Sequence, residues 1–173
     1  MFAKGMRPSV GWPIHAMAGS TADTWKASVS GDGTHNISCK VSDKAGNTAT
    51  TPDTVKIDTK APSFSSCSVS PSTLRVPANN HKLVSIKASV TLSDPTDGFT
   101  LLSVESNQPD SGLARDDVSN DIQLWNLDTA DIEGKLRAER YGGARIYTLT
   151  YQGKDLAGNI AQCKPTVTVP KVG

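Results

Sequence analysis

Acidic side chains gather between residues 105 and 121, and their types are the first sign of possible chemistry in the sequence. The set comprises Glu105, Asp110, Asp116, Asp117 and Asp121, with Arg115 as the only cation among them. Carboxylate oxygens in a loop that contains Ser and Gly suit calcium, which takes about 6–8 oxygen ligands. The spacing matches no EF-hand loop. Two interpretations therefore stand: a calcium site that stiffens the loop, and a solvated loop whose carboxylates cap turns.

Residue types used in catalysis are present but form no motif. His35 and His81 have no second histidine at metal-ligand spacing, and the sequence contains no Gly-x-Ser-x-Gly elbow. Geometry and not chain order defines a catalytic triad, so distant residues could still form one. With so many Ser and Asp residues, however, such a triad can be drawn on almost any chain of this composition. We expect no enzyme, and a small stand-alone hydrolase is the least favoured function.

Three charged residues and one tryptophan each have two interpretations. Arg137, Glu139 and Arg145 are expected to alternate outward on neighbouring strands and to form a cross-strand ion pair. The alternative is that Arg137 and Glu139 brace the acidic loop. Trp125 follows Leu124 and, if it points outward, offers its ring for stacking on a sugar. The alternative for Trp125 is ordinary packing against a sheet edge.

An internal repeat indicates which elements position these residues. Residues 37–47 recur as residues 149–159, and both copies contain the motif Asp-x-Ala-Gly-Asn. Glycine supplies the positive φ that a tight turn needs. The aspartates of the two motifs, Asp43 and Asp155, are expected to cap the turns by hydrogen bonds to the backbone. Each copy is therefore predicted to be a β-hairpin.

Alternating side chains predict the strands. Residues 84–92 alternate between aliphatic and polar side chains, which is typical of a strand with one buried face. The residues expected to point inward on the hairpin strands are His35, Ile37, Cys39 and Val41, then Tyr147, Leu149 and Tyr151, and finally Cys163, Val167 and Val169. No stretch has helical periodicity, so the chain is predicted to be all-β. Hydrophobic residues make up 36% and aromatic residues 5%, which predicts a thin, aliphatic core.

A boundary is predicted at residues 58–62, where a strand ends and Pro62 begins a new extended segment. Residues 62–173 are then expected to form one complete module. Residues 21–61 hold only the last strands of another module, whose open face and edges need a cover. Candidates for this cover are residues 1–20, the complete module, or a second copy of the chain in a homodimer. Residues 1–20 show no periodicity and are interpreted as a leader, a segment introduced by cloning, or the remainder of a cut module.

Charge and hydropathy argue against two classes of partner. The net charge is +1 and the charged residues are scattered, so no nucleic-acid binding is expected. No apolar run approaches the roughly 20 residues of a transmembrane helix, so no membrane insertion is expected. The first residues lack the apolar core of a signal peptide, and a signal for export would therefore lie upstream.

Several segments together resemble a known family. They are residues 29–38, 43–47 and 58–62 in the first part, and residues 77–84, 106–110, 120–123, 136–140 and 147–151 in the second. The series is similar to bacterial immunoglobulin-like (Big or HYR-like) repeat modules of exported surface proteins. The resemblance is specific for fold and weak for function, because such modules serve as stalks, spacers and adhesive tips on many parent proteins.

The resemblance implies an immunoglobulin-like antiparallel β-sandwich, with one complete module preceded by an incomplete one. It implies a structural or interaction module, namely a spacer or terminal domain of a larger bacterial extracellular or cell-surface protein, with calcium as a possible stiffening ion. The implied partners are neighbouring immunoglobulin-like modules and a glycan or protein ligand. The alternative function is a carbohydrate-binding accessory domain of an exported hydrolase, with Trp125 and residues 106–121 as the contact surface.

The cysteines take their meaning from this resemblance. In immunoglobulin-like sandwiches the first strand commonly pairs parallel with the last, which would place Cys67 and Cys163 side by side. A disulfide between them fits an oxidising compartment and would stabilise the fold by up to about 4–5 kcal/mol. The alternative is two small buried thiols on neighbouring strands. Cys39 has no candidate partner and is expected to be a buried free thiol rather than a nucleophile.

Overall fold

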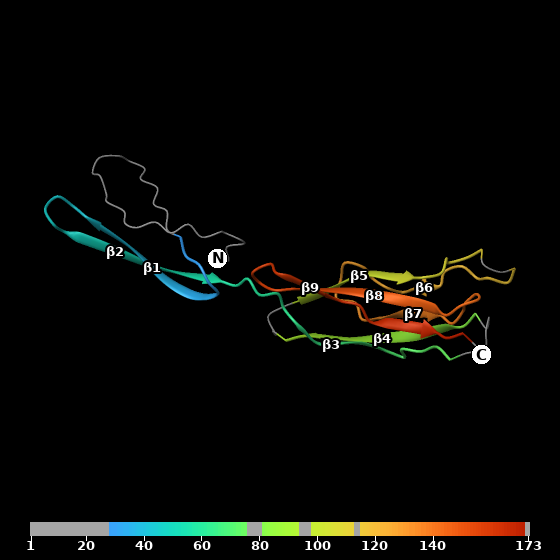
Figure 1. The fold of residues 1–173 in the computed structure, drawn as a ribbon. Coiled ribbons are helices and arrows are strands. Elements are labelled where there is room, and N and C mark those ends of the chain that lie inside the picture. The colour runs from blue at the N-terminus through green and yellow to red at the C-terminus, as the bar shows by residue number, and fades with distance from the viewer. Residues whose placement is uncertain (1–27, 76–80, 94–97, 113–114, 172–173) are drawn as a thin grey trace. The chain divides into compact units, whose positions relative to one another are not determined.

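The computed structural model describes residues 28–75, 81–93, 98–112 and 115–171 (Figure 1). Every regular element in these residues is a β-strand, which confirms the all-β prediction. The same residues include no helix that is long and apolar enough to cross a membrane. The interpretation of residues 1–20 as a leader falls outside the described residues.

The chain forms two compact units, which we call unit 1 (Met1–Lys60) and unit 2 (Ala61–Gly173). In unit 1, strands β1 (Gly33–Ser42) and β2 (Thr48–Ile57) pair antiparallel along their full length. Most side chains of both strands are exposed. The prediction that Cys39 is buried is wrong: the thiol is free but exposed, because the described part of unit 1 has only one sheet layer.

The turns of the two predicted hairpins have the same hydrogen bonds. In unit 1, Asp43 accepts one bond from the backbone N–H of Asn47 at 2.8 Å and another from its side-chain amide at 2.7 Å. In unit 2, Asp155 accepts the equivalent two bonds from Asn159, both at 2.8 Å. The glycine of each motif has a positive φ, 88° in unit 1 and 91° in unit 2. Both hairpin predictions are confirmed, down to the capping role of the aspartates.

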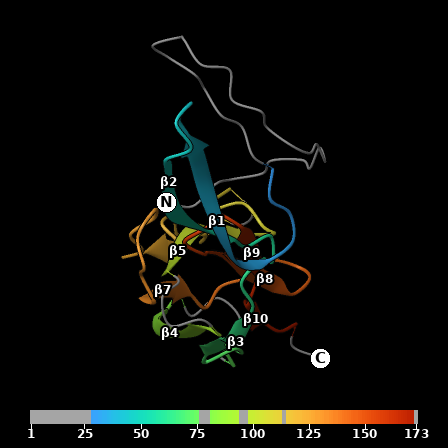
Figure 2. The same ribbon diagram turned by 90° about the vertical axis from the view of Figure 1, so that its left-hand side faces the viewer.

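Unit 2 is built from two antiparallel sheets. The first has the strand order β3-β4-β7-β6, and the second has the order β10-β8-β5, with β9 also paired to β8. The first sheet consists of β3 (Phe64–Ser70), β4 (Leu83–Leu92), β6 (Ile122–Gln123) and β7 (Glu133–Arg137). The second consists of β5 (Gly98–Ser106), β8 (Arg145–Lys154), β9 (Ile160–Cys163) and β10 (Thr166–Val169). Figure 2 shows β3 and β4 in one layer and β5 and β8 in the other, so unit 2 is a β-sandwich.

The core of unit 2 lies between the two sheets. Strand side chains point in turn to the core and to solvent, which explains the alternation seen in the sequence. The buried apolar residues are Leu74, Ile86, Ala88, Leu101, Leu136, Ala138, Tyr147, Leu149, Tyr151, Val167 and Val169. The core is therefore largely aliphatic, as the composition predicts, with two tyrosines from β8 as its largest apolar members.

The predicted disulfide between Cys67 and Cys163 is present, with Cα atoms 6.4 Å apart. It joins β3 of the first sheet to β9 of the second and so fastens the two layers together. The expected pairing of first and last strands is found only in part. β3 pairs with β4, and a parallel bridge between Thr73 and Thr168 links the chain after β3 to β10.

Candidate functional site

Six charged or titratable side chains and one tyrosine lie together at one end of unit 2, where β5 and β7 end and β4 and β8 begin. We call this set the polar network; it consists of His81, Asp110, Asp121, Arg137, Glu139, Arg145 and Tyr147. The histidine precedes β4, the two aspartates lie between β5 and β6, and the remaining residues lie on or next to β7 and β8. The sandwich therefore brings together residues from four separate parts of the sequence.

A buried carboxylate between two guanidinium groups forms the centre of the polar network. Arg137 Nε donates a hydrogen bond to Asp121 Oδ1 at 3.1 Å, and Arg145 Nη1 donates to Asp121 Oδ2. The exposed fraction is 1% for Asp121, 0% for Arg145 and 7% for Arg137. Buried ions need both an opposite charge and hydrogen bonds to be tolerated. The three residues therefore form one ion cluster, in which each depends on the others.

The prediction that Arg137, Glu139 and Arg145 point outward is wrong, because all three are buried. Strand alternation predicts an exposed face only where one side of a sheet meets water. Here the chain before β6 runs along the end of β7, and the backbone N–H of Arg137 donates to Asp121 O at 2.9 Å. The alternative interpretation, in which Arg137 and Glu139 brace the acidic loop, agrees with these contacts.

Each guanidinium group also holds loop carbonyl groups. Arg137 Nη1 donates to His81 O at 2.7 Å, and Arg137 Nη2 donates to Ser119 O at 3.0 Å. Arg145 Nη2 donates to Pro109 O at 3.1 Å. These carbonyl oxygens accept from the guanidinium N–H groups that do not contact the carboxylate. The two arginines therefore attach the loops before β4 and before β6 to β7 and β8.

Gln108 and Asp110 connect the loop after β5 to its surroundings. Asp110 accepts hydrogen bonds from the backbone N–H of Asn120 at 2.9 Å and of Asp121 at 2.7 Å. The side-chain amide of Gln108 donates to Tyr141 O and accepts from Tyr141 N, both at 3.0 Å. The carboxylate of Asp110 thus caps a turn, which is the role that the solvated-loop interpretation assigns to such residues.

Tyr147 links the ion cluster to the core. Its hydroxyl donates to Arg137 O at 2.8 Å and accepts from Arg145 Nη1 at 3.2 Å. Burial raises the pKa of Tyr147, against the opposing effect of the Arg145 hydrogen bond. The hydroxyl therefore keeps its proton at neutral pH and remains a hydrogen-bond donor.

A histidine–glutamate pair lies beside the ion cluster. His81 Nδ1 and Glu139 Oε2 are 2.8 Å apart, and Glu139 is 4% exposed. Burial raises the pKa of Glu139, a hydrogen bond with Asp117 raises it further, and His81 acts in the opposite direction. His81 Nε2 also lies 3.8 Å from Asp116, and the residue has a φ of 54°, which is uncommon without glycine. The pair therefore attaches the segment before β4 to the residues that follow β7.

The five predicted calcium ligands have different partners in the structure. Asp121 faces two guanidinium groups, and Asp110 accepts backbone N–H groups. Asp116 and Asp117 lie beside the His81–Glu139 pair, whereas Glu105 is an exposed residue of β5. In the part of the chain that the structure describes, no three His, Cys, Asp or Glu side chains are grouped as metal ligands. Calcium binding by this loop stays a prediction.

Trp125 is partly buried and packs against the core. The indole lies on the backbone of Gly134 in β7, where a Cβ atom would overlap the ring. The indole N–H is buried, without a hydrogen-bond partner among the described residues. The arrangement agrees with the packing interpretation of Trp125, and stacking of the ring on a sugar stays a prediction.

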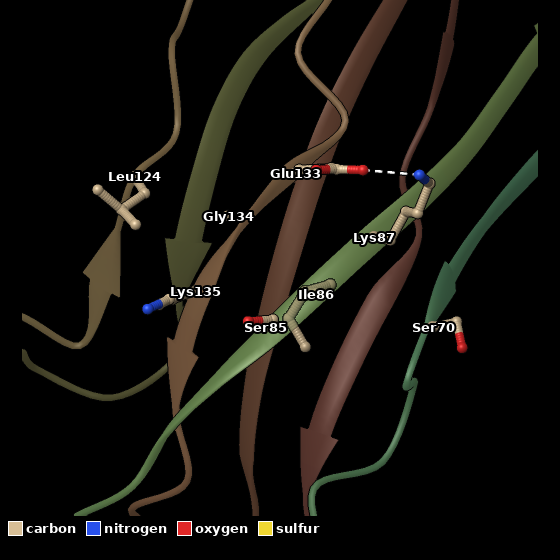
Figure 3. A pocket seen from close by; sticks show the side chains of 8 residues that line it. All are labelled: Ser70, Ser85, Ile86, Lys87, Leu124, Glu133, Gly134 and Lys135. Carbon is tan, nitrogen blue, oxygen red and sulfur yellow. Dashed lines mark hydrogen bonds and ion pairs between the residues drawn. The ribbon is translucent and has the colours of Figure 1, made fainter.

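A shallow groove of about 390 Å³ lies along the first sheet (Figure 3). Its polar wall includes Ser85, Lys87 and Glu133, and Lys87 Nζ lies 2.6 Å from Glu133 Oε1. Leu124, which is 68% exposed and has a φ of 60°, forms an apolar wall. Lys87 and Glu133 neutralise each other, and Lys135 adds a further ammonium group to the lining of the groove.

Sequence reasoning found the acidic residues of the polar network but missed the pairing of Asp121 with Arg145 and the contact of His81 with Glu139. The signal available for Arg145 was its place two residues before Tyr147, on the face that the sequence assigns to the core. A charged residue at a core position predicts a buried counter-charge. In comparisons with known proteins, no protein-family model matches the chain, and no curated protein matches it.

Proposed function

We propose that the chain is a structural and interaction segment of a larger bacterial extracellular or cell-surface protein, where it acts as a spacer or terminal immunoglobulin-like module. The observation that carries the proposal is the disulfide between Cys67 and Cys163. Disulfides form and persist in oxidising environments and are rare in the cytosol, where thiols are kept reduced. A sandwich whose two layers are covalently joined is suited to the outside of a cell.

The strand order of unit 2 supports the immunoglobulin-like part of the proposal. Its sheets have the orders β3-β4-β7-β6 and β10-β8-β5. Constant-type immunoglobulin domains have the strands A-B-E-D in one sheet and C-F-G in the other. If β3 is strand A, β4 is B, β5 is C, β6 is D, β7 is E, β8 is F, and β9 with β10 is G, the two orders agree. The repeated hairpin of unit 1 would then contribute the F and G strands of a preceding module.

The polar network supports a structural role rather than a catalytic one. Its arginines and Asp110 contact backbone groups of the loops, so the charges hold the end of the sandwich in one conformation. A buried ion cluster that joins loops to strands limits the motion of that end. A spacer benefits from this, because a rigid end transmits the orientation of one module to the next.

The proposal is tested by determining in which cell fraction the native protein resides and whether Cys67 and Cys163 are oxidised there. Cells that produce it are fractionated, free thiols are blocked by alkylation, and the peptides that contain Cys67 and Cys163 are identified by mass spectrometry. We expect a disulfide-linked peptide pair in the medium or cell-surface fraction. Native protein recovered from the cytosol with both thiols free would contradict the proposal.

Three further measurements decide what unit 2 and the whole chain bind. Dose-dependent binding to defined glycans on an array would replace the spacer by the carbohydrate-binding alternative. Thermal unfolding with added calcium and with EDTA decides whether calcium belongs to the proposal; an unchanged melting temperature removes it. Light scattering tests the homodimer expected through the incomplete module.

A further inference from the structure

We propose that the Cys67–Cys163 disulfide makes unit 2 a mechanically clamped tether, in which tension passes between the ends of the unit without unfolding the chain between the two cysteines. This inference rests on the proposed function, because a spacer in an extended surface protein is pulled at both ends. It adds a property that a spacer does not need: an extensibility that depends on the redox state of one bond.

The position of the cysteines in the chain defines the path of the tension. Unit 2 begins at Ala61, a few residues before Cys67, and Cys163 is a few residues before the end of β10 at Val169. The sequence separation of the two cysteines is 96 residues. Force applied to the two ends reaches the sulfur atoms through the short outer segments and crosses the covalent bond. The long inner segment, with most of the core and all of the polar network, cannot be pulled out to its full length while the bond is intact.

The two outer segments are held by hydrogen bonds that the force loads in shear. Before Cys67, β3 pairs with β4 from Phe64 onward; after Cys163, β10 pairs with β8 over its whole length. The parallel bridge between Thr73 and Thr168 shows that the chain leaving β3 and β10 run in the same direction. Pulling the start of β3 and the end of β10 apart therefore draws each strand along its own axis. Several hydrogen bonds must then break together, which resists extension more than peeling them one at a time.

The exit of the chain has an additional anchor. Arg140 Nε donates a hydrogen bond to Pro170 O at 2.8 Å, directly after β10. The final pair of β10 joins Val169 to Arg145, whose side chain is held by the ion cluster. The polar network therefore supports the strand through which tension leaves unit 2.

The clamp makes a prediction about length. A fully extended chain spans about 3.3–3.6 Å per residue, so the 96-residue separation corresponds to roughly 330 Å. The intact disulfide keeps the same two Cα atoms 6.4 Å apart. With the bond intact, the extended length of unit 2 is limited to that of its outer segments and the disulfide, roughly 60 Å in total.

Optical tweezers on the full chain, held through handles at its two termini, test the proposal. The Cys39→Ser substitution is made in every sample, because the exposed thiol of Cys39 would otherwise exchange with the disulfide. The extended length at high force is compared for the oxidised protein, the same protein after addition of reductant, and the Cys67→Ser/Cys163→Ser variant. We expect the reduced protein and the variant to be longer than the oxidised protein by roughly 330 Å.

Two outcomes would overturn the clamp: an oxidised chain that extends as far as the variant, or a reduced chain no longer than the oxidised one. The comparison does not require the variant to fold, since total length at high force is the same for a folded and an unfolded starting state. Failure of the proposed function is a separate result. Native protein found reduced in the cytosol refutes the extracellular spacer and leaves the length difference intact, whereas equal lengths refute the clamp and leave the location unchanged.

Discussion

Arg145 is fully buried, and its guanidinium group contacts a carboxylate, a backbone carbonyl and a phenol oxygen. The neutral oxygens provide hydrogen bonds, but only Asp121 provides the opposite charge in the ion cluster with Arg145 and Arg137. Removing one partner of a buried ion pair is costly because it leaves an uncompensated charge away from water. Asp121 is therefore the side chain on which this end of unit 2 depends most.

We predict that Asp121→Asn lowers the free energy of unfolding by about 3–5 kcal/mol, since two buried guanidinium groups lose their counter-charge. Urea denaturation followed by circular dichroism measures the change. Asp116→Asn is the matched control, because the Asp116 side chain is 63% exposed and its replacement should change stability by no more than about 0.5 kcal/mol. Equal effects of the two substitutions would contradict a central role for Asp121.

The pKa of Glu139, raised by burial and by Asp117, leads to a prediction about pH. A carboxyl group with a raised pKa binds its proton more tightly in the folded state than in the unfolded state. It therefore contributes most stability below the unfolded value of 4.5, and this contribution is lost as pH rises through the folded pKa. Glu139→Gln keeps the side-chain shape and removes the titration.

We therefore expect the unfolding free energy of the native chain to fall, relative to that of Glu139→Gln, as pH is raised from 4 towards neutrality. Urea denaturation at a series of pH values measures the difference. Glu105→Gln, at an exposed position of β5, controls for the loss of one negative charge. A difference that stays constant, or that grows in favour of the native chain with rising pH, would show that Glu139 does not titrate as its burial requires.

The residues of the polar network illustrate what the sequence can and cannot predict at this scale. The acidic stretch was accessible from residue types alone, whereas the sequence left the bracing role of Arg137 and Glu139 open beside an exposed cross-strand ion pair. Which carboxylate meets which arginine was not, because Asp121 and Arg145 approach one another only through the path of a loop. A calcium ion and an arginine satisfy the same carboxylate oxygens, so an acidic stretch by itself does not distinguish between them.

At the scale of elements, strand β7 has a contact that no periodicity reveals. The indole of Trp125 lies on Gly134, and the missing side chain of the glycine makes this approach possible. We predict that Gly134→Ala destabilises unit 2 by about 1–3 kcal/mol, the usual cost of overpacking a core. Thermal and urea unfolding measure the loss.

Gly98→Ala in β5 is the matched control for this prediction, because a Cβ atom there meets no atom within 4 Å. We expect its effect to be small or stabilising, since alanine reduces the freedom of the unfolded chain. The Trp125→Leu/Gly134→Ala double variant should lose less than the sum of the two single variants, because the substitutions share one contact. Additive losses would mean that Gly134 matters for another reason.

The hairpins could be predicted from the sequence because all the bonds of their turns are local. Asn47 donates two hydrogen bonds to the carboxylate of Asp43, which is only four residues earlier in the chain. These and other hydrogen bonds of the turn lower the pKa of Asp43, with the largest effect from the Asn47 side chain. In the second hairpin, burial acts to raise the pKa of Asp155, but the hydrogen bonds from the turn outweigh it and the pKa is lowered. The order of strands across a sheet has no such local signature. The short strand β6 was not predicted, since Ile122 and Gln123 are too few for a pattern.

At the scale of the whole molecule, the prediction succeeded where the chain supplies both layers of a sandwich. In unit 2, inward-pointing residues meet a second sheet and are buried, as alternation predicts. In unit 1, the same alternation is present on β1, yet Cys39 and Val41 are exposed because the described residues provide one layer only. A pattern of apolar residues predicts which face is suited to burial, and the presence of a partner layer decides whether burial occurs.

The disulfide of unit 2 should also stabilise the protein when no force acts on it. Joining residues 96 positions apart removes conformations from the unfolded chain, and for a loop of this length the chain-entropy model gives about 4–5 kcal/mol. We predict that Cys67→Ser/Cys163→Ser lowers the unfolding free energy by up to this amount, measured by urea denaturation with the near-ultraviolet circular dichroism of the buried tyrosines as the signal. Cys39→Ser is the control, because this thiol is exposed and should be replaceable at little cost. A double variant as stable as the native chain would mean that the contacts between the two sheets alone hold unit 2 together, and that the disulfide acts only when the molecule is under tension.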